Sequence, residues 1–190
     1  MKELHEVTFD ELNYEASKKF SSSDFVSNLF SLYRFTKESP IQTLLHELKY
    51  QNKFNIGKMF GEQLAKKYFH DFLSLGIDIV VPVPLHRVKK AERGYNQAFY
   101  FAKGIAKILD CKVRTDIIYR KRFTKSQTKL NQKEREENVR EAFYFQKKIN
   151  GENVLLVDDV ITTGSTIISC ARVIKECGAK NIYTASIALA

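Results

Sequence analysis

The chain has 190 residues, of which 44% are hydrophobic and 28% are charged. At this length one domain buries about 70% of its unfolded surface, so we expect it to fold without a disulfide framework or a structural metal. No apolar run reaches the roughly 18 residues of a membrane span, and the acidic N-terminus has no apolar signal-peptide core, so we expect neither a membrane span nor secretion.

The formal net charge of +9 is concentrated in one part of the chain. Residues 86–140 contain 16 Lys and Arg and 6 Asp and Glu, so this stretch carries about +10 and the rest is close to neutral. An excess of this kind favours a polyanionic partner, which would be pyrophosphate, nucleic acid or both. The alternative is a solvated basic face, which is common in proteins.

The three cysteines, Cys111, Cys170 and Cys177, are odd in number and lack C-x-x-C spacing. Cys170 and Cys177 lie seven residues apart on an expected helix, so they could share one face as small buried side chains. This pattern favours reduced thiols over a redox or metal site, and we expect a cytoplasmic protein.

The first part of the chain predicts a strand and two helices after a lead-in. Residues 1–24 have no strong pattern, and residues 30–35 alternate apolar and polar side chains like a short strand. Pro40 begins a helix whose apolar residues recur at spacings of three and four. A second helix is expected from about Ile56 to Phe72, and Gly76 closes this region.

The middle of the chain predicts a buried strand, a helix and two shorter strand-like pieces. Residues 77–83 form a nearly continuous β-branched run, which is typical of a strand buried on both faces of a parallel sheet. A helix is expected from Asn96 to Leu109. Strand-like pieces follow at residues 117–119 and 142–145, and the polar segment 121–137 between them predicts a long loop.

The last part of the chain repeats the pattern of a buried strand followed by a helix. Val154–Val157 predicts the strand, Gly164 begins a helix to about Cys177, and Gly178 supplies its stop. Residues 182–189 predict a final strand. This order of strands and helices predicts an α/β fold, in which ligands bind outside the carboxyl ends of the strands.

Two acids and a hydroxyl-rich loop follow the strand VLLV. Asp158 and Asp159 would lie side by side at the edge of the sheet, where carboxylates suit ribose hydroxyls. The loop Thr162–Thr166 lies at a helix start, where free N–H groups and the helix dipole favour a phosphate. A ribose 5-phosphate is the simplest ligand that satisfies both features. The alternative is an acidic pair that only caps the helix.

The segment VLLVDDVITTGST resembles the motif with which type I phosphoribosyltransferases bind phosphoribosyl pyrophosphate (PRPP). The resemblance implies a type I phosphoribosyltransferase fold, in which helices and a small N-terminal helical or hood region flank a mostly parallel sheet. It also implies Mg²⁺ that enters with PRPP and has no direct protein ligand. The implied catalytic and ribose-binding residues are Asp158 and Asp159, and the implied phosphate-binding residues are Val160, Thr162, Thr163, Gly164, Ser165 and Thr166.

A basic segment follows the first buried strand. In type I phosphoribosyltransferases a loop at this place grips pyrophosphate, and this chain offers cations there for a highly charged leaving group. The alternative is an exposed basic turn. The predicted pyrophosphate-binding residues are Arg87, Lys89, Lys90 and Arg93.

Three segments resemble the ComF family of competence-associated proteins: LHELKY, PVPLHRVKKAERGYNQA and KSQTKLNQKEREENVREAF. The resemblance covers roughly residues 30–190, so we expect a lead-in over residues 1–30 and a phosphoribosyltransferase-like domain over residues 31–190. Many members of that family begin with a four-cysteine zinc module. This chain has no cysteine before Cys111, so we expect no zinc.

The polar loop from Lys121 to Glu137 is a candidate lid. Its positive charges repel one another without an anion, so we expect the loop to close over the site when PRPP or pyrophosphate binds. The competing interpretation is a helix over residues 132–139 that is always docked. The predicted lid residues are Lys125, Gln127, Arg135 and Asn138.

Two functions remain open from the sequence. The first is a phosphoribosyltransferase that transfers ribose 5-phosphate to an acceptor and releases pyrophosphate. The second is a non-catalytic DNA-uptake protein. For this second function the ComF resemblance implies a role in competence and a helicase-like partner, and the basic stretch could contact single-stranded DNA. The intact acids and hydroxyl loop favour retained PRPP binding in either case.

Overall fold

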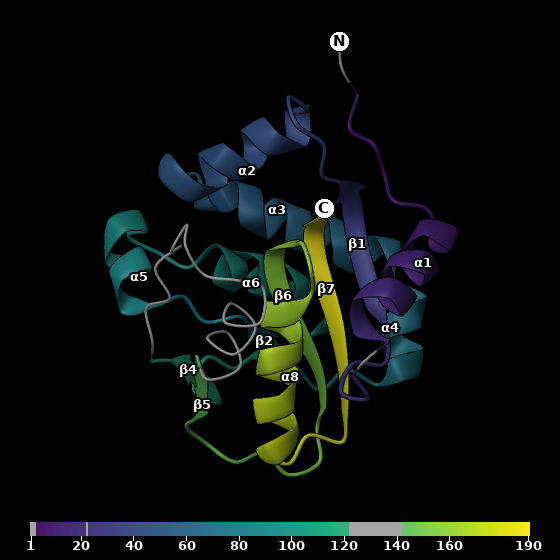
Figure 1. The fold of residues 1–190 in the computed structure, drawn as a ribbon, viewed down its shortest axis with the longest axis vertical. Helices are drawn as coiled ribbons and strands as arrows, with labels where there is room; N and C mark the ends of the chain where they lie inside the picture. The colour runs from purple at the N-terminus through teal and green to yellow at the C-terminus, as the bar shows by residue number, and fades with distance from the viewer. Residues whose placement is uncertain (1–2, 22, 122–141) are drawn as a thin grey trace.

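The computed structural model describes residues 3–21, 23–121 and 142–190. Its strands span Leu29–Arg34 (β1), Ile79–Pro82 (β2), Lys112–Val113 (β3), Ile118–Arg120 (β4), Phe143–Phe145 (β5), Asn153–Ile161 (β6) and Asn181–Leu189 (β7). Five of them form a parallel sheet in the order β1-β7-β6-β2-β3, and β4 pairs with β5 in a separate antiparallel hairpin (Figure 1). The predicted α/β fold with a mostly parallel sheet is confirmed.

The apolar runs of the sequence form the central strands. β2 and β6 are paired in register from Ile79 with Val154, and residues 79–82 and 154–157 are buried on both faces of the sheet, as predicted. β1 is also buried on both faces, although its sequence alternates. Its polar residue Ser31 is accommodated because the Oγ atoms of Ser31 and Ser186 are hydrogen-bonded at 3.1 Å.

Helices cover both faces of the sheet (Figure 1). The helices span Phe9–Phe20 (α1), Pro40–Tyr50 (α2), Phe54–Lys67 (α3), Phe69–Leu75 (α4), Arg87–Arg93 (α5), Gln97–Leu109 (α6) and Ser165–Glu176 (α8). Successive residues of β6 contact opposite layers. Leu155 packs in the layer of α2, α3, α4 and α6, whereas Leu156 packs in the layer of α1, α8 and the hairpin. Among the described residues no helix is both long and apolar enough to cross a membrane.

The helix expected from about Ile56 to Phe72 is two helices in the structure. Tyr68 has φ −109° and ψ 27°, which ends α3 and precedes α4. The Tyr68 hydroxyl donates a 2.8 Å hydrogen bond to the backbone oxygen of Ser31 in β1, so the break accompanies a contact that is distant in sequence. Gly76 closes α4 at φ +60°, as predicted.

The lead-in contains helix α1, although residues 1–24 have no strong apolar pattern. Thr8 caps this helix, because its Oγ1 accepts a 3.3 Å hydrogen bond from the N–H of Glu11 while the Glu11 carboxylate accepts one of 2.9 Å from the N–H of Thr8. This reciprocal pair is a capping box, and its T-x-x-E signature was readable in the sequence. The buried residues of α1 are Leu12, Glu15 and Phe20.

Candidate functional site

The segments that follow β2 and β6 meet at one edge of the sheet. The two strands are parallel neighbours, so their carboxyl ends lie next to each other. α5 follows β2, and a short loop leads from β6 into α8. α2 reaches the same edge, because Lys49 near its end contacts Asp159 in β6 (Figure 1). The acidic and the basic regions singled out in the sequence are therefore adjacent.

The loop between β6 and α8 has the geometry of an anion cradle. Gly164 has φ +81° and directly precedes Ser165, the first residue of α8, so the loop presents a helix N-terminus. The hydroxyls of Thr163 and Ser165 are hydrogen-bonded to each other. The residues of this loop, together with Asp158, line a small cavity. Hydroxyls, backbone N–H groups and the helix dipole thus converge on one space that suits a phosphate.

Helix α1 packs directly against this loop. A Cβ atom at Gly164 would lie 3.0 Å from Cε1 of Phe20 and 3.2 Å from Cβ of Lys19, so a larger residue would require these neighbours to shift. The positive φ of Gly164 disfavours other residues as well. The Lys19 ammonium donates to the backbone oxygen of Thr162, the first residue of the loop. The loop is therefore held from α1 at both its beginning and its middle.

Asp158 and Asp159 lie within β6 rather than after its end, which corrects the predicted strand boundary. β6 continues because its pairing with β7 extends to Ile161. Asp159 forms an ion pair with Lys49 of α2, with 2.9 Å between Oδ2 and Nζ. The backbone N–H groups of Asp159 and Val160 donate 2.9 Å hydrogen bonds to Asp158 Oδ1 and Asp159 Oδ1, respectively. The two carboxylates are thus held by the backbone and by one cation.

The carboxyl of Asp158 lies in surroundings that disfavour its charge. Burial raises the pKa of Asp158 well above its ordinary value, and the neighbouring Asp159 raises it further, whereas Lys49 acts in the opposite sense. Asp158 also interacts with Arg120 of β4 and Cys170 of α8. Burial lowers the pKa of Arg120, although Cys170 and Asp158 favour its charged form. The acidic pair is therefore a centre at which additional positive charge would be favourable.

The basic segment, expected as a loop, forms the short helix α5. Lys89 and Arg93 lie four residues apart and are half-buried, whereas Arg87 and Lys90 are exposed. Burial lowers the pKa of Lys89, and the nearby charges of Arg93 and Arg120 lower it further. Two of the four predicted pyrophosphate ligands, Lys89 and Arg93, therefore lie near the cations that border the acidic pair. The other two, Arg87 and Lys90, are exposed to solvent.

Three cations beside the acids and the loop were not predicted: Lys19, Lys49 and Arg120. Lys49 lies in the segment LHELKY, whose resemblance to ComF proteins was its one sequence signal. Arg120 stands out as a charged residue in a short strand, where burial requires compensating contacts. Lys19 could have been noticed only through the capping box of α1. Each reaches the site through a contact between segments far apart in the chain.

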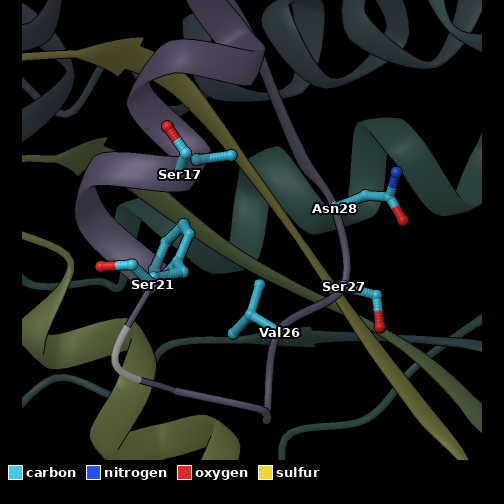
Figure 2. Close-up of a pocket in the computed structure, with 7 residues that line it drawn as sticks. Ser17, Ser21, Val26, Ser27 and Asn28 are labelled. Atoms are coloured by element: carbon cyan, nitrogen blue, oxygen red, sulfur yellow. The ribbon is translucent and has the colours of Figure 1, made fainter.

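A second cavity, of about 220 Å³, lies between α1 and the segment that leads into β1. Figure 2 shows Ser17 of α1 and Ser21, which follows the helix, opposite residues 26–28 of that segment. Phe20 lines this cavity and also approaches Gly164 of the loop. The described residues that line this cavity are uncharged, so its chemistry differs from that of the anion cradle.

The predicted lid residues Lys125, Gln127, Arg135 and Asn138 lie outside the described residues. The described residues on the two sides of residues 122–141 are joined next to the hairpin of β4 and β5. The N–H of Lys121, which follows β4, donates a 3.0 Å hydrogen bond to the backbone oxygen of Ala142, which precedes β5.

Sequence comparisons identify relatives over most of the chain. The phosphoribosyl transferase domain family matches residues 95–190. Competence protein F of Haemophilus influenzae is 31% identical over 160 residues, which cover 80% of this chain and 69% of that protein. DNA utilization protein YhgH of Escherichia coli O6:H1 is 28% identical over 146 residues, which cover 75% of this chain. The chain spans 64% of the length of that relative.

A comparison with solved structures supports the fold. Glutamine phosphoribosylpyrophosphate amidotransferase from B. subtilis superposes with a TM-score of 0.50 and 20% sequence identity. The match covers 74% of this chain and 30% of that chain. At this identity the likeness concerns the α/β arrangement alone.

Proposed function

This chain belongs to the phosphoribosyl transferase domain family, together with Competence protein F, and from that premise we propose that it binds PRPP at the segment joining β6 to α8. The observation that carries the proposal is the convergence of three features at one sheet edge. These are a hydroxyl-rich helix start, two carboxylates and a group of half-buried cations.

The loop and the acids divide the sugar phosphate between them. Residues 162–166 hold the 5′-phosphate through backbone N–H groups, hydroxyls and the helix dipole. Asp158 and Asp159 accept hydrogen bonds from ribose hydroxyls. The proximity of Asp158 to the cavity lined by the loop supports this division, because ribose hydroxyls lie a short distance from the 5′-phosphate of the same molecule.

The cations on α5 contact the pyrophosphate of PRPP. Lys89 and Arg93 are half-buried beside Arg120, and a highly charged leaving group would relieve their mutual repulsion. Arg93 also stacks over the ring of Tyr50, at 5.4 Å from the ring centroid, which fixes the direction of its guanidinium. The exposed Arg87 and Lys90 contribute long-range attraction for an anion.

The residues present also fit Mg²⁺ bound together with PRPP. Carboxylate, hydroxyl and phosphate oxygens are the hard donors that Mg²⁺ prefers, and burial and the neighbouring Asp159 raise the pKa of Asp158, so a nearby cation would favour its charged form. Asp158 and Asp159 would lie near an ion that PRPP oxygens and water would mainly hold, and such an ion would supply positive charge toward the pyrophosphate.

The reaction that this arrangement supports is transfer of ribose 5-phosphate to an acceptor. The loop and the acids hold the sugar, and Lys89 and Arg93 stabilise the departing pyrophosphate. Turnover is tested by screening nucleobases, amines and water for PRPP-dependent release of pyrophosphate. Release that depends on one acceptor and is lost in Asp158→Asn/Asp159→Asn supports an enzyme. If no acceptor gives release above that of the double variant, PRPP is a ligand rather than a substrate.

A second candidate function is binding of single-stranded DNA without catalysis. The relatives named for competence and DNA utilization point to it, as does a cluster of aromatic rings. Phe54 stacks on Tyr100 at 4.8 Å between ring centroids, and Tyr95 and Phe99 lie against Tyr100. Rings of this kind can stack with bases. Loss of oligonucleotide binding in Phe54→Ala, with PRPP binding retained, would favour this function.

Ligand-dependent thermal unfolding tests the proposal that PRPP binds. A ligand that binds only the folded state at 100 times its Kd adds about 2.7 kcal/mol to the free energy of unfolding. We expect PRPP with Mg²⁺ to raise the melting temperature, and inorganic phosphate at the same concentration to raise it far less. Equal effects of PRPP and inorganic phosphate would contradict the proposal.

A further inference from the structure

Lys19 lies in a buried charge network that joins α1 to β1. Its Nζ is 3.0 Å from Oε2 of Glu15, and the two side chains are only 8% and 6% exposed. Oε1 of Glu15 accepts a 2.7 Å hydrogen bond from Nη1 of Arg34 in β1. Burial acts to raise the pKa of Glu15, but the hydrogen bonds from Arg34 and Lys19 outweigh burial, and the pKa lies below its ordinary value. Glu15 therefore stays charged and orients Lys19.

The same ammonium reaches the start of the phosphate loop. Lys19 Nζ donates to the backbone oxygen of Thr162 and, at 2.8 Å, to the backbone oxygen of Ala190. The N–H of Ala190 is in turn bonded to the backbone oxygen of Ile161 at 3.0 Å. Lys19 thus links α1 to the carboxyl ends of both β6 and β7.

The ammonium of Lys19 is engaged by three partners within the protein: the carboxylate of Glu15 through an ion pair, and the backbone oxygens of Thr162 and Ala190 through hydrogen bonds. Lys19 therefore acts on the site through the loop. In a trans peptide the C=O and N–H groups point in opposite directions. Fixing the oxygen of Thr162 toward α1 therefore directs the N–H of Thr163 away from α1 and toward the side of the loop on which a phosphate would be held.

A second contact supports the loop from the same helix. The ring of Phe20 approaches Gly164 closely enough that a Cβ atom there would lie 3.0 Å from Cε1. Lys19 and Phe20 are adjacent in sequence at the end of α1, so one helix end sets the position of Thr162 and of Gly164.

We propose that Lys19 is a positioning residue of the phosphate site, which fixes the backbone of the hydroxyl loop from α1 through the carbonyl of Thr162. The inference rests on the proposed function, because it assigns the role of α1 in binding the 5′-phosphate of PRPP. It gives residues 8–20 a part in the site, although they precede the region that carries the family motifs.

The test compares two probes that would bind opposite ends of the PRPP site. Ribose 5-phosphate depends on the loop, whereas pyrophosphate depends on the cations of α5. We expect Lys19→Met to weaken ribose 5-phosphate binding by about tenfold or more, the size of effect found when a residue that orients a ligand-binding group is lost. Pyrophosphate binding should stay within about twofold of wild type, which also reports that the variant is folded.

Two further variants complete the design. Lys18→Met is the matched control, because Lys18 is the exposed neighbour whose ammonium lies over the ring of Tyr14, and it should leave both affinities unchanged. Lys19→Arg retains the charge and should recover most of the lost affinity. If Lys19→Met does not bind pyrophosphate because it fails to fold, Lys19→Gln, which keeps one amide donor group, is measured in its place with the same expected split.

The outcomes separate the two proposals. Wild-type affinity for ribose 5-phosphate in Lys19→Met or Lys19→Gln would overturn the positioning role and leave PRPP binding intact. Equal loss of both probes in a folded variant would also overturn it, because the effect would not be specific to the loop. If the wild-type protein binds neither probe, the proposed function itself fails.

Discussion

Asp158 is the residue whose ionisation the fold most strongly opposes. Because its pKa is raised in the folded state, first by burial and then by Asp159, the folded protein retains a proton that the unfolded chain releases. Stability is therefore lost as pH rises above the unfolded pKa. We expect Asp158→Asn to increase the free energy of unfolding at pH 7 by about 1 kcal/mol, because a neutral amide avoids the cost of placing a charge in these buried surroundings.

The control for this prediction is the same measurement of the free energy of unfolding of Asp158→Asn at low pH. Near about pH 3, Asp158 is largely protonated in both states, so the substitution should then have little effect on stability. Denaturant unfolding at both pH values measures the difference. A gain of the same size at both would show that the charge of Asp158 is not its source.

Lys49 is the residue that compensates the acidic pair. Its ion pair with Asp159 is mostly buried, with side chains 24% and 14% exposed. Lys49→Met leaves Asp159 without this partner, so we expect the free energy of unfolding to fall by about 1–2 kcal/mol. Combining it with Asp159→Asn should restore most of that loss, because no unpaired carboxylate remains.

An exposed pair nearby provides the comparison for Lys49. Lys53 and Glu47 are 3.1 Å apart, with Lys53 half exposed. Lys53→Met should change the free energy of unfolding by less than about 0.5 kcal/mol. If chemical denaturation shows equal effects of Lys49→Met and Lys53→Met, Lys49 has no special role in holding Asp159.

For single residues, the sequence predicted those of the candidate site that are contiguous in the chain and missed those that folding brings to it. The loop and acids are contiguous from Asp158 to Thr166, so their chemistry could be predicted from one segment. Lys19, Lys49 and Arg120 reach that segment only through contacts formed by folding. The sequence likewise did not show which cations of α5 are half-buried and which are exposed. That difference follows from the helical spacing of these residues, whereas the sequence analysis predicts a loop there.

Two helices on one face of the sheet cross at a pair of glycines. A Cβ atom at Gly61 in α3 would lie 2.9 Å from Cα of Gly104 in α6 and would clash with the backbone oxygen of Phe101. We therefore expect Gly61→Ala to lower the free energy of unfolding by about 3 kcal/mol, despite the higher helix propensity of alanine. Gly151 has φ +82° but open space around it, so Gly151→Ala should lower it by only about 1 kcal/mol.

Urea unfolding of the two alanine variants decides whether this crossing is as tight as described. A neutral or stabilising effect of Gly61→Ala would mean that α3 and α6 can separate without loss. An effect of Gly151→Ala as large as that of Gly61→Ala would contradict the expectation that the close helix contact costs more than a positive φ alone.

Among the elements, those with local end signals were predicted best. α2 begins at Pro40, and α6 follows Asn96, whose side chain accepts a 3.1 Å hydrogen bond from the N–H of Ala98. The break at Tyr68 has no such signal, because its hydroxyl contact is with β1. Helix α1 did carry a signal, the capping box, but its residues lack a long apolar stripe.

For the whole molecule, we expect folding without zinc. The three cysteines are free, and Cys170 and Cys177 are buried, as predicted. None precedes Cys111, so residues 1–110 offer no cysteine ligand for zinc. Elemental analysis of the purified protein should find far less than one zinc per chain, and a chelator should leave the melting temperature unchanged. One zinc per chain, or unfolding by the chelator, would contradict this expectation.

The overall fold class followed from the buried apolar runs, whereas the strand order did not. A run that is apolar on both faces requires a covered, parallel sheet, and β2 and β6 meet that requirement. The position of β7 between β1 and β6 depends on pairings across most of the chain. The family motif pointed to the carboxyl ends of the strands, and β2 and β6 do end at a common edge.

The central claim is that Asp158, Asp159 and residues 162–166 hold the sugar phosphate of PRPP. Titration calorimetry with PRPP in the presence of Mg²⁺ tests it most directly, with wild type, Asp158→Asn/Asp159→Asn and Asp71→Asn, which replaces an exposed acid on α4. We predict one site per chain in wild type and in Asp71→Asn, and an affinity at least about a hundredfold weaker in the double variant, since both carboxyl groups that would bind the ribose hydroxyls are replaced. Equal PRPP binding by the wild type and the double variant would contradict the account.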